Sequence, residues 1–175
     1  MFQTSNIYEI DLITFIPNVI KRRIKKECQE MRDRYDEIMI CCTNPNDITV
    51  SFKRNHNCYI FRIPSHYPFM NPTLTINGLN QNNFFDLKTN RTRSILKYIT
   101  GFTCLCCHSY LCKNNWSPAI TLQVVINQIE EYKEIKKNIF LKILADKIKE
   151  KYLINDIDLD SWLFNVSSPH SFLHD

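Results

Sequence analysis

Apolar residues recur at helical spacing in three parts of the 175-residue chain. The first part covers residues 17–35, and Pro17 suits its first turn because the N–H of that position has no helical acceptor anyway. The second begins at Ser117, as N-cap, and Pro118, as the first helical residue, and it is apolar on much of its surface. The third covers residues 134–152. The pattern therefore predicts an N-terminal helix and two C-terminal helices, with a shorter helix at 91–99.

Four shorter segments are apolar or alternate between apolar and polar residues, as half-buried strands do. They cover residues 36–42, 48–52, 58–63 and 73–76, with turns rich in asparagine between them. Asn77 and Gly78 close the last segment. Residues 80–90 are polar and are expected to form a loop, in which Phe84 and Phe85 pack against the core. The predicted fold class is α+β, with helices on one face of a four-stranded antiparallel meander.

Length and composition narrow this picture. The chain suits one domain over residues 1–152 with an extension at 153–175, and a hydrophobic content of 44% supports a normal core. The net charge of +4 is small, and the basic residues of 21–26 are soon followed by acidic ones, so nucleic-acid binding is not expected. Gly78 and Gly101 are the only glycines, which excludes a glycine-rich phosphate-binding loop.

Residues 1–10 lack a basic region followed by an apolar run, and no stretch is apolar enough to cross a bilayer. We therefore expect no membrane association and a cytoplasmic or nuclear location, a reducing compartment in which the eight cysteines stay unpaired. Four of them fall on apolar faces and are expected to be buried, inert thiols. These are Cys28, Cys41, Cys42 and Cys58.

Two runs of residues resemble the ubiquitin-conjugating enzyme (UBC) family. YPFMNP at 67–72 is similar to the family's YPFxxP turn after the third strand, and NWSPAITL at 115–122 is similar to its NWSPALTI segment before a helix. RIKKE at 23–27 resembles the family's first helix more weakly. Together the resemblance covers residues 17–152. From the residues alone, Tyr67, Phe69 and Trp116 are expected to pack in the core.

The resemblance implies a UBC-like fold and an enzyme that carries ubiquitin, or a ubiquitin-like protein, as a cysteine thioester and transfers it to lysine. The implied partners are that modifier, an activating enzyme and a ubiquitin ligase, and no metal or organic cofactor acts in the chain itself. The residues implied to face the activating enzyme are Arg22, Arg23 and Lys26. Those implied to face a ligase are Phe69, Ser117, Pro118 and Ala119.

The resemblance leaves two candidates for the nucleophile. Cys107 begins the run CHSYL at 107–111, which is similar to the family's CLDIL or CLSIL run ahead of the tryptophan. Cys104 ends GFTC at 101–104, which with the next leucine is similar to the family's GxICL. We prefer Cys107, because its register continues to Trp116 without a long insertion, and Cys104 is the alternative. His108 and Lys113 are polar or cationic neighbours that favour a thiolate.

The chain departs from the family at one important place. The HPN tripeptide, whose asparagine stabilises the oxyanion, is missing, and Asn82, Asn83 and Asn90 are the candidates to replace it. Losing one oxyanion donor typically costs about 100- to 1,000-fold in rate. The alternative function is therefore a catalytically weak or inactive UBC-like module that binds ubiquitin or another partner.

The dense cysteines also allow a metal site, although we expect none. Four thiols lie close enough in sequence to hold zinc, but the adjacent Cys106 and Cys107 are not expected to face one ion easily. The alternative ligand set is Cys104, Cys106, Cys107 and Cys112.

Overall fold

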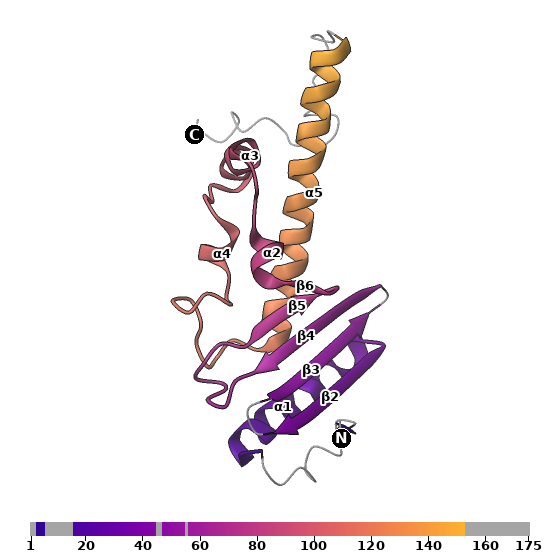
Figure 1. Ribbon diagram of the computed structural model, residues 1–175, viewed down its shortest axis with the longest axis vertical. Coiled ribbons are helices and arrows are strands. Elements are labelled where there is room, and N and C mark those ends of the chain that lie inside the picture. The colour runs from indigo at the N-terminus through magenta and orange to yellow at the C-terminus, as the bar shows by residue number, and fades with distance from the viewer. Residues whose placement is uncertain (1–2, 6–15, 45–46, 55, 153–175) are drawn as a thin grey trace, which may run out of the picture. The chain divides into compact units, whose positions relative to one another are not determined.

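The computed structural model describes residues 3–5, 16–44, 47–54 and 56–152. They group into two compact units. The first contains the described residues up to Asp86 together with Cys104–Ile129, and the second contains Leu87–Thr103 and the described residues from Glu130 onward (Figure 1). The expected extension at 153–175 lies outside the described residues. Helices and an antiparallel sheet are both present, so the α+β class is confirmed.

The sheet of the first unit has six described strands in the order β1-β2-β3-β4-β5-β6, and every neighbouring pair is antiparallel. The strands are β1 Gln3–Ser5, β2 Glu37–Asn44, β3 Asp47–Arg54, β4 Asn57–Ile63, β5 Thr73–Ile76 and β6 Leu79–Asn80. β2 to β5 are the four predicted strands, whereas the short β1 and β6 were not predicted. Along β3, Ile48, Val50 and Phe52 are buried and alternate with partly exposed residues, as a one-sided sheet requires.

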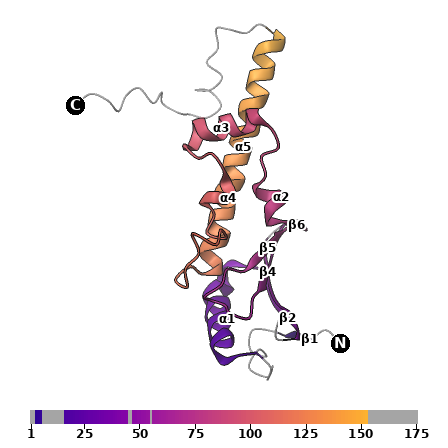
Figure 2. The ribbon, with the colours of Figure 1, turned by 60° about the vertical axis from the view of Figure 1, so that its left-hand side comes forward.

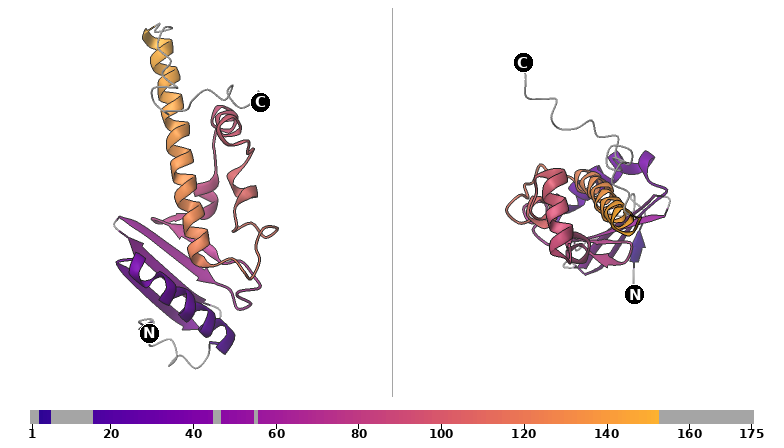
Figure 3. Two further views of the ribbon diagram at one scale, coloured as in Figure 1. Left: turned by 180° about the vertical axis from the view of Figure 1, so that it is seen from behind. Right: turned by 90° about the horizontal axis from the view of Figure 1, so that it is seen from above.

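Helix α1, Asn18–Met31, lies against one face of this sheet (Figure 3). Its buried stripe includes Ile20, Ile24 and Cys28, which follow the predicted helical spacing. Pro17 precedes the first helical residue, and its carbonyl accepts the first helical hydrogen bond, from the N–H of Lys21 at 3.0 Å. The helix ends earlier than predicted, and the 3-10 turn η2, Arg32–Arg34, follows it.

The connection after β5 is a tight turn, because Asn77 and Gly78 both have positive φ, 49° and 81°. The turn leads through β6 into helix α2, Gln81–Phe85, at the end of the sheet (Figure 2). The prediction of a loop at 80–90 is therefore wrong in its first half. Asn80 caps the helix, because its side chain accepts from the N–H of Asn82 at 2.9 Å. Phe84 and Phe85 are buried, as predicted.

In the second unit, helix α3, Asn90–Thr100, matches the short helix predicted at 91–99. Thr89 and Thr92 form a capping box at its start, and Gly101, with φ 76°, ends it in the left-handed conformation. Arg91 donates to Asp146 at 3.1 Å, which joins α3 to the C-terminal part of the last helix.

That last helix, α5, is one continuous element of 31 residues, Leu122–Tyr152, and so the prediction of two separate helices is wrong. Residues 130–134 contain no proline or glycine that would stop a helix, and Tyr132 is buried there. The predicted start at Ser117 is also wrong. The N–H of Ile120 donates to the Ser117 carbonyl at 3.0 Å in a separate turn, and the Thr121 hydroxyl accepts from the N–H of Val124 at 3.3 Å as the actual cap.

No helix in the described ranges combines the length and the apolar character that crossing a membrane requires.

Candidate functional site

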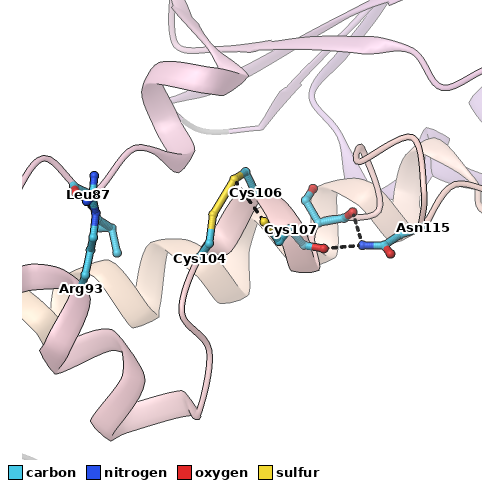
Figure 4. Close-up of a disulfide and its surroundings, with 7 residues drawn as sticks. Leu87, Arg93, Cys104, Cys106, Cys107 and Asn115 are labelled. Carbon is cyan, nitrogen blue, oxygen red and sulfur yellow. Dashed lines mark hydrogen bonds between the residues drawn. A yellow bond between two sulfur atoms is a disulfide. The ribbon is translucent and has the colours of Figure 1, made fainter.

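The candidate site is the segment 104–116. It contains the short helix α4, Leu105–His108, and continues through a series of turns towards the start of α5 (Figure 4). Leu105 and Leu111 are fully or nearly buried and fix the segment to the first unit. Between them Ser109 is also buried, and its hydroxyl accepts from the N–H of Leu111 at 3.1 Å. The segment is therefore held at Leu105, Ser109 and Leu111, while the other residues from Cys106 to Tyr110 are exposed.

Cys107 is an exposed, free thiol, as a nucleophile requires. Cys104 and Cys106 form a disulfide, so the expectation that all the cysteines stay unpaired is wrong for this pair. The Cys107 sulfur lies 3.9 Å from that of Cys106 (Figure 4). The two adjacent residues therefore do turn their sulfurs to one place, contrary to expectation. Cys112 is partly exposed and is not a member of this sulfur group.

Side-chain amides form hydrogen bonds with backbone carbonyls and one backbone N–H of this segment. The Asn115 Nδ2 donates to the carbonyl of Cys107 at 2.7 Å and to that of Ser109 at 3.0 Å (Figure 4). Gln128, from α5, donates to the His108 carbonyl at 3.1 Å and accepts from the N–H of Tyr110 at 2.8 Å. The backbone from the Cys107 carbonyl to the Tyr110 N–H is thus fixed by side-chain hydrogen bonds.

A third amide and an indole connect the segment to the turn that carries the YPFMNP run. The Asn71 Nδ2 donates to the Leu111 carbonyl at 2.7 Å. The Trp116 Nε1–H donates to the Pro68 carbonyl at 2.8 Å, and its ring centroid lies 6.1 Å from that of Tyr67. The sequence predicted Trp116 in the core, but it is only partly buried.

Below this turn, a buried carboxylate joins three elements. The Glu27 side chain, 2% exposed, accepts from the Tyr67 hydroxyl at 2.7 Å and from the N–H of Leu122, the first residue of α5, also at 2.7 Å. It also forms an ion pair with Arg23, which donates to the Ile120 carbonyl at 3.1 Å. Glu27 therefore connects α1, the proline-rich turn and the start of α5.

This network raises the pKa of two of its members, Tyr67 and Arg23. Burial, together with the negative charge of Glu27, raises the pKa of the Tyr67 hydroxyl, which therefore stays protonated and remains a donor. Burial by itself lowers the pKa of Arg23, but the charge of Glu27 and the hydrogen bonds to Glu27 and Tyr67 outweigh it and raise that pKa. Arg23 therefore stays positively charged over the ordinary pH range.

Most residues expected to face partners are on the surface. Arg22 and Lys26 are exposed on α1, whereas Arg23 is 24% exposed and is engaged by Glu27 and Ile120. Phe69 is 75% exposed, so its expected packing in the core is wrong. The exposed residues of the turn that follows Trp116 are Ser117, Pro118 and Ala119.

The candidates to replace the HPN asparagine are divided between the two units. Asn82 and Asn83 are exposed in α2, which contacts α4, whereas Asn90 belongs to the second unit at the start of α3. The amides that hydrogen-bond to the cysteine segment are instead those of Asn71, Asn115 and Gln128, which the sequence did not single out. The available signals were the position of Asn71 in the YPFMNP run and that of Asn115 next to the tryptophan of the NWSP run.

The thiols away from the site are of two kinds. Burial, with a smaller effect of the Glu27 charge, raises the pKa of Cys28 to about 12. Burial and the neighbouring Asp47 raise that of Cys42 to about 11. Both are therefore inert at neutral pH, as expected. Cys41 and Cys58 are only partly buried, because they fall on the other face of their strands, so the expectation that they are buried is wrong.

In comparisons with protein families, curated proteins and solved structures, none matched this chain.

Proposed function

We propose that the chain is a UBC-like enzyme that carries ubiquitin, or a ubiquitin-like protein, as a thioester on Cys107. The observation that carries the proposal is an exposed, free Cys107 whose flanking backbone is fixed by Asn115 and Gln128. The order of the elements supports it as well: a helix, an antiparallel meander with the YPFMNP turn between β4 and β5, the cysteine segment and a helix after NWSP. The disulfide at Cys104 favours Cys107 over Cys104 as the nucleophile.

In the proposed reaction, the Cys107 thiolate attacks the thioester carbonyl carbon that joins the modifier to the activating enzyme. A new carbon–sulfur bond forms, and the activating enzyme leaves as a thiolate. A lysine amine of the substrate then attacks the same carbon. The carbon–nitrogen bond forms, the bond to Cys107 breaks, and the amine gives up a proton to solvent. A fixed backbone around Cys107 favours both attacks, because it holds the thioester in one orientation.

The proposed ligase surface consists of Phe69 and the turn Ser117, Pro118 and Ala119. The hydrogen bond from Trp116 to the Pro68 carbonyl connects the two loops, so their exposed residues share one neighbourhood. An exposed phenylalanine beside an exposed proline offers apolar area to a partner at little desolvation cost. Arg22 and Lys26, exposed on α1, are the proposed contacts of the activating enzyme.

The test is a loading assay. Reduced protein is mixed with an activating enzyme, Mg-ATP and ubiquitin, and the products are separated on a non-reducing gel. We expect one adduct that disappears when thiol is added. Cys107→Ala should abolish it, whereas Cys104→Ala and the matched control Cys112→Ala should retain it. An adduct that persists in Cys107→Ala would refute the assignment, and loss in Cys104→Ala alone would transfer it to Cys104.

One observation favours the alternative, a UBC-like module that binds a partner without catalysis. Asn115, the amide nearest Cys107, already donates both of its N–H groups to backbone carbonyls, and so it does not replace the missing HPN asparagine as an oxyanion donor. Such a module would form no thioester with ubiquitin or any ubiquitin-like protein. It would bind its partner equally well as wild type and as Cys107→Ala in a calorimetric titration.

A further inference from the structure

The cysteine segment also contains a group of three sulfurs. The Sγ atoms of Cys104, Cys106 and Cys107 all lie within 4.8 Å of one another. Two of the three residues are exposed and Cys104 is partly exposed, so the group is open to solvent. With Cys104 and Cys106 joined as a disulfide, only one thiol of the three is free. Reduction of that bond would place three thiols at one point of the surface.

We propose that the reduced form of this group binds a single zinc ion through the thiolates of Cys104, Cys106 and Cys107. The spacing of the sulfurs fits such an ion. Zinc–sulfur bonds of about 2.3 Å in a tetrahedral arrangement hold two sulfurs about 3.8 Å apart. The sulfurs of Cys106 and Cys107 lie 3.9 Å apart already. The third sulfur, that of Cys104, needs only to leave the disulfide and stay within 4.8 Å of the other two, as it is now.

The backbone that carries these ligands is fixed without the metal. Leu105, between the first two cysteines, is fully buried, and Asn115 donates to the Cys107 carbonyl at 2.7 Å. Little ordering of the chain is therefore needed on binding, which favours affinity. Three protein ligands leave the fourth position of the zinc ion to water.

The redox state decides which chemistry the group performs. Two electrons and two protons from an added phosphine and water convert the disulfide to two thiols, and the phosphine becomes its oxide. Zinc then displaces the protons of the three thiols into solvent. The ion and the disulfide use the same sulfurs, so each excludes the other. The inference is independent of the proposed function, because zinc binding does not require Cys107 to accept a modifier.

The experiment uses cadmium as a spectroscopic probe, because its thiolate complexes absorb in the ultraviolet. Full-length protein is reduced under argon, freed of reductant and titrated with cadmium, with and without an excess of zinc. We expect an absorption that saturates at one ion per chain, and the excess of zinc should shift the titration to higher cadmium concentrations, because both ions compete for the same thiolates. The same wild-type protein with its disulfide intact should give less than about a tenth of this signal. This comparison needs no substitution and so does not depend on a variant that folds.

Matched variants then assign the ligands. Cys106→Ser and Cys107→Ser should each weaken binding by more than about tenfold, the least that losing even a supporting group around a metal usually costs. Cys112→Ser should bind as wild type, since its sulfur lies outside the group. Absence of a stoichiometric signal in the reduced wild type would overturn the proposal, as would equal losses in Cys112→Ser and Cys106→Ser. The loading assay reports on the proposed function separately, because Cys106→Ser retains Cys107.

Discussion

Replacement of Glu27 is the most direct test of how the frame supports the site. Its carboxylate is the common acceptor for the Tyr67 hydroxyl, the Leu122 N–H and the Arg23 guanidinium. In Glu27→Ala all three donors lose this partner at once, and water does not reach the position easily, because Glu27 is buried beneath the turn. The variant therefore probes α1, the YPFMNP turn and the start of α5 together.

The expected loss follows from the environment of the carboxylate. Removing one partner of a buried ion pair costs about 3–5 kcal/mol, because the remaining charge and donors stay desolvated. We expect Glu27→Ala to lower the free energy of unfolding by that amount. Glu27→Gln keeps the size and one acceptor oxygen but places an NH2 group against a donor, so we expect a loss of about 1–3 kcal/mol. Both changes should weaken the first turn of α5 most.

The measurement is urea denaturation followed by circular dichroism, with hydrogen exchange at Leu122 as a local readout. The matched control is Glu30→Gln, since Glu30 lies in the same helix but is exposed and pairs with Lys26 at 3.8 Å. Such a surface pair contributes about 0–1 kcal/mol. A loss below about 1 kcal/mol in Glu27→Ala, or an equal loss in Glu30→Gln, would refute the view that this carboxylate supports the frame.

Three further outcomes are expected. Trp116→Phe should lower the free energy of unfolding by about 1 kcal/mol through loss of the Nε1–H bond to Pro68. Trp116→Ala should lower it by about 2–3 kcal/mol, less than for a fully buried tryptophan because Trp116 is only partly buried; unchanged urea midpoints in both would contradict this. Asn115→Ala should leave the melting temperature within a few degrees of wild type, yet increase hydrogen exchange at Cys107 and Ser109 and lower loading. Asn114→Ala, at the exposed neighbouring position, should change neither the exchange nor the loading. Stability should fall as the pH rises from 9 towards 11, because the folded state keeps a proton on Cys28, with its pKa of about 12, that the unfolded chain loses near 9.0. Denaturation midpoints that stay flat over that range in wild type would contradict this, and midpoints that fall equally in Cys28→Ala would assign the effect to another group.

The sequence predicts the sheet well because its evidence is local. The turn at Asn77 and Gly78 requires positive φ, and the strand before it was predicted at the same residues that the structure shows. The start of α5 was predicted wrongly for a different reason. Ser117 and Pro118 have the residue types of a helix start, but Thr121, four positions later, provides the cap. Both are good local starts, and the choice between them depends on Glu27, which lies far away in sequence and accepts from the N–H of Leu122.

The conformation of the cysteine segment also depends on contacts that its own sequence does not reveal. It has one short helix and several turns, so many of its backbone groups need partners from outside it. Asn71 and Gln128 are such partners, and Asn115 adds one from within the segment; in a sequence these amides look like ordinary surface positions. Trp116, in contrast, was recognisable as a large apolar residue, but its contact with the Pro68 carbonyl was not. The orientation of Cys107 is therefore determined by polar side chains on the turn after β4, on the turns before α5 and on α5 itself. A change in any of these places alters the position of the thiol without touching it.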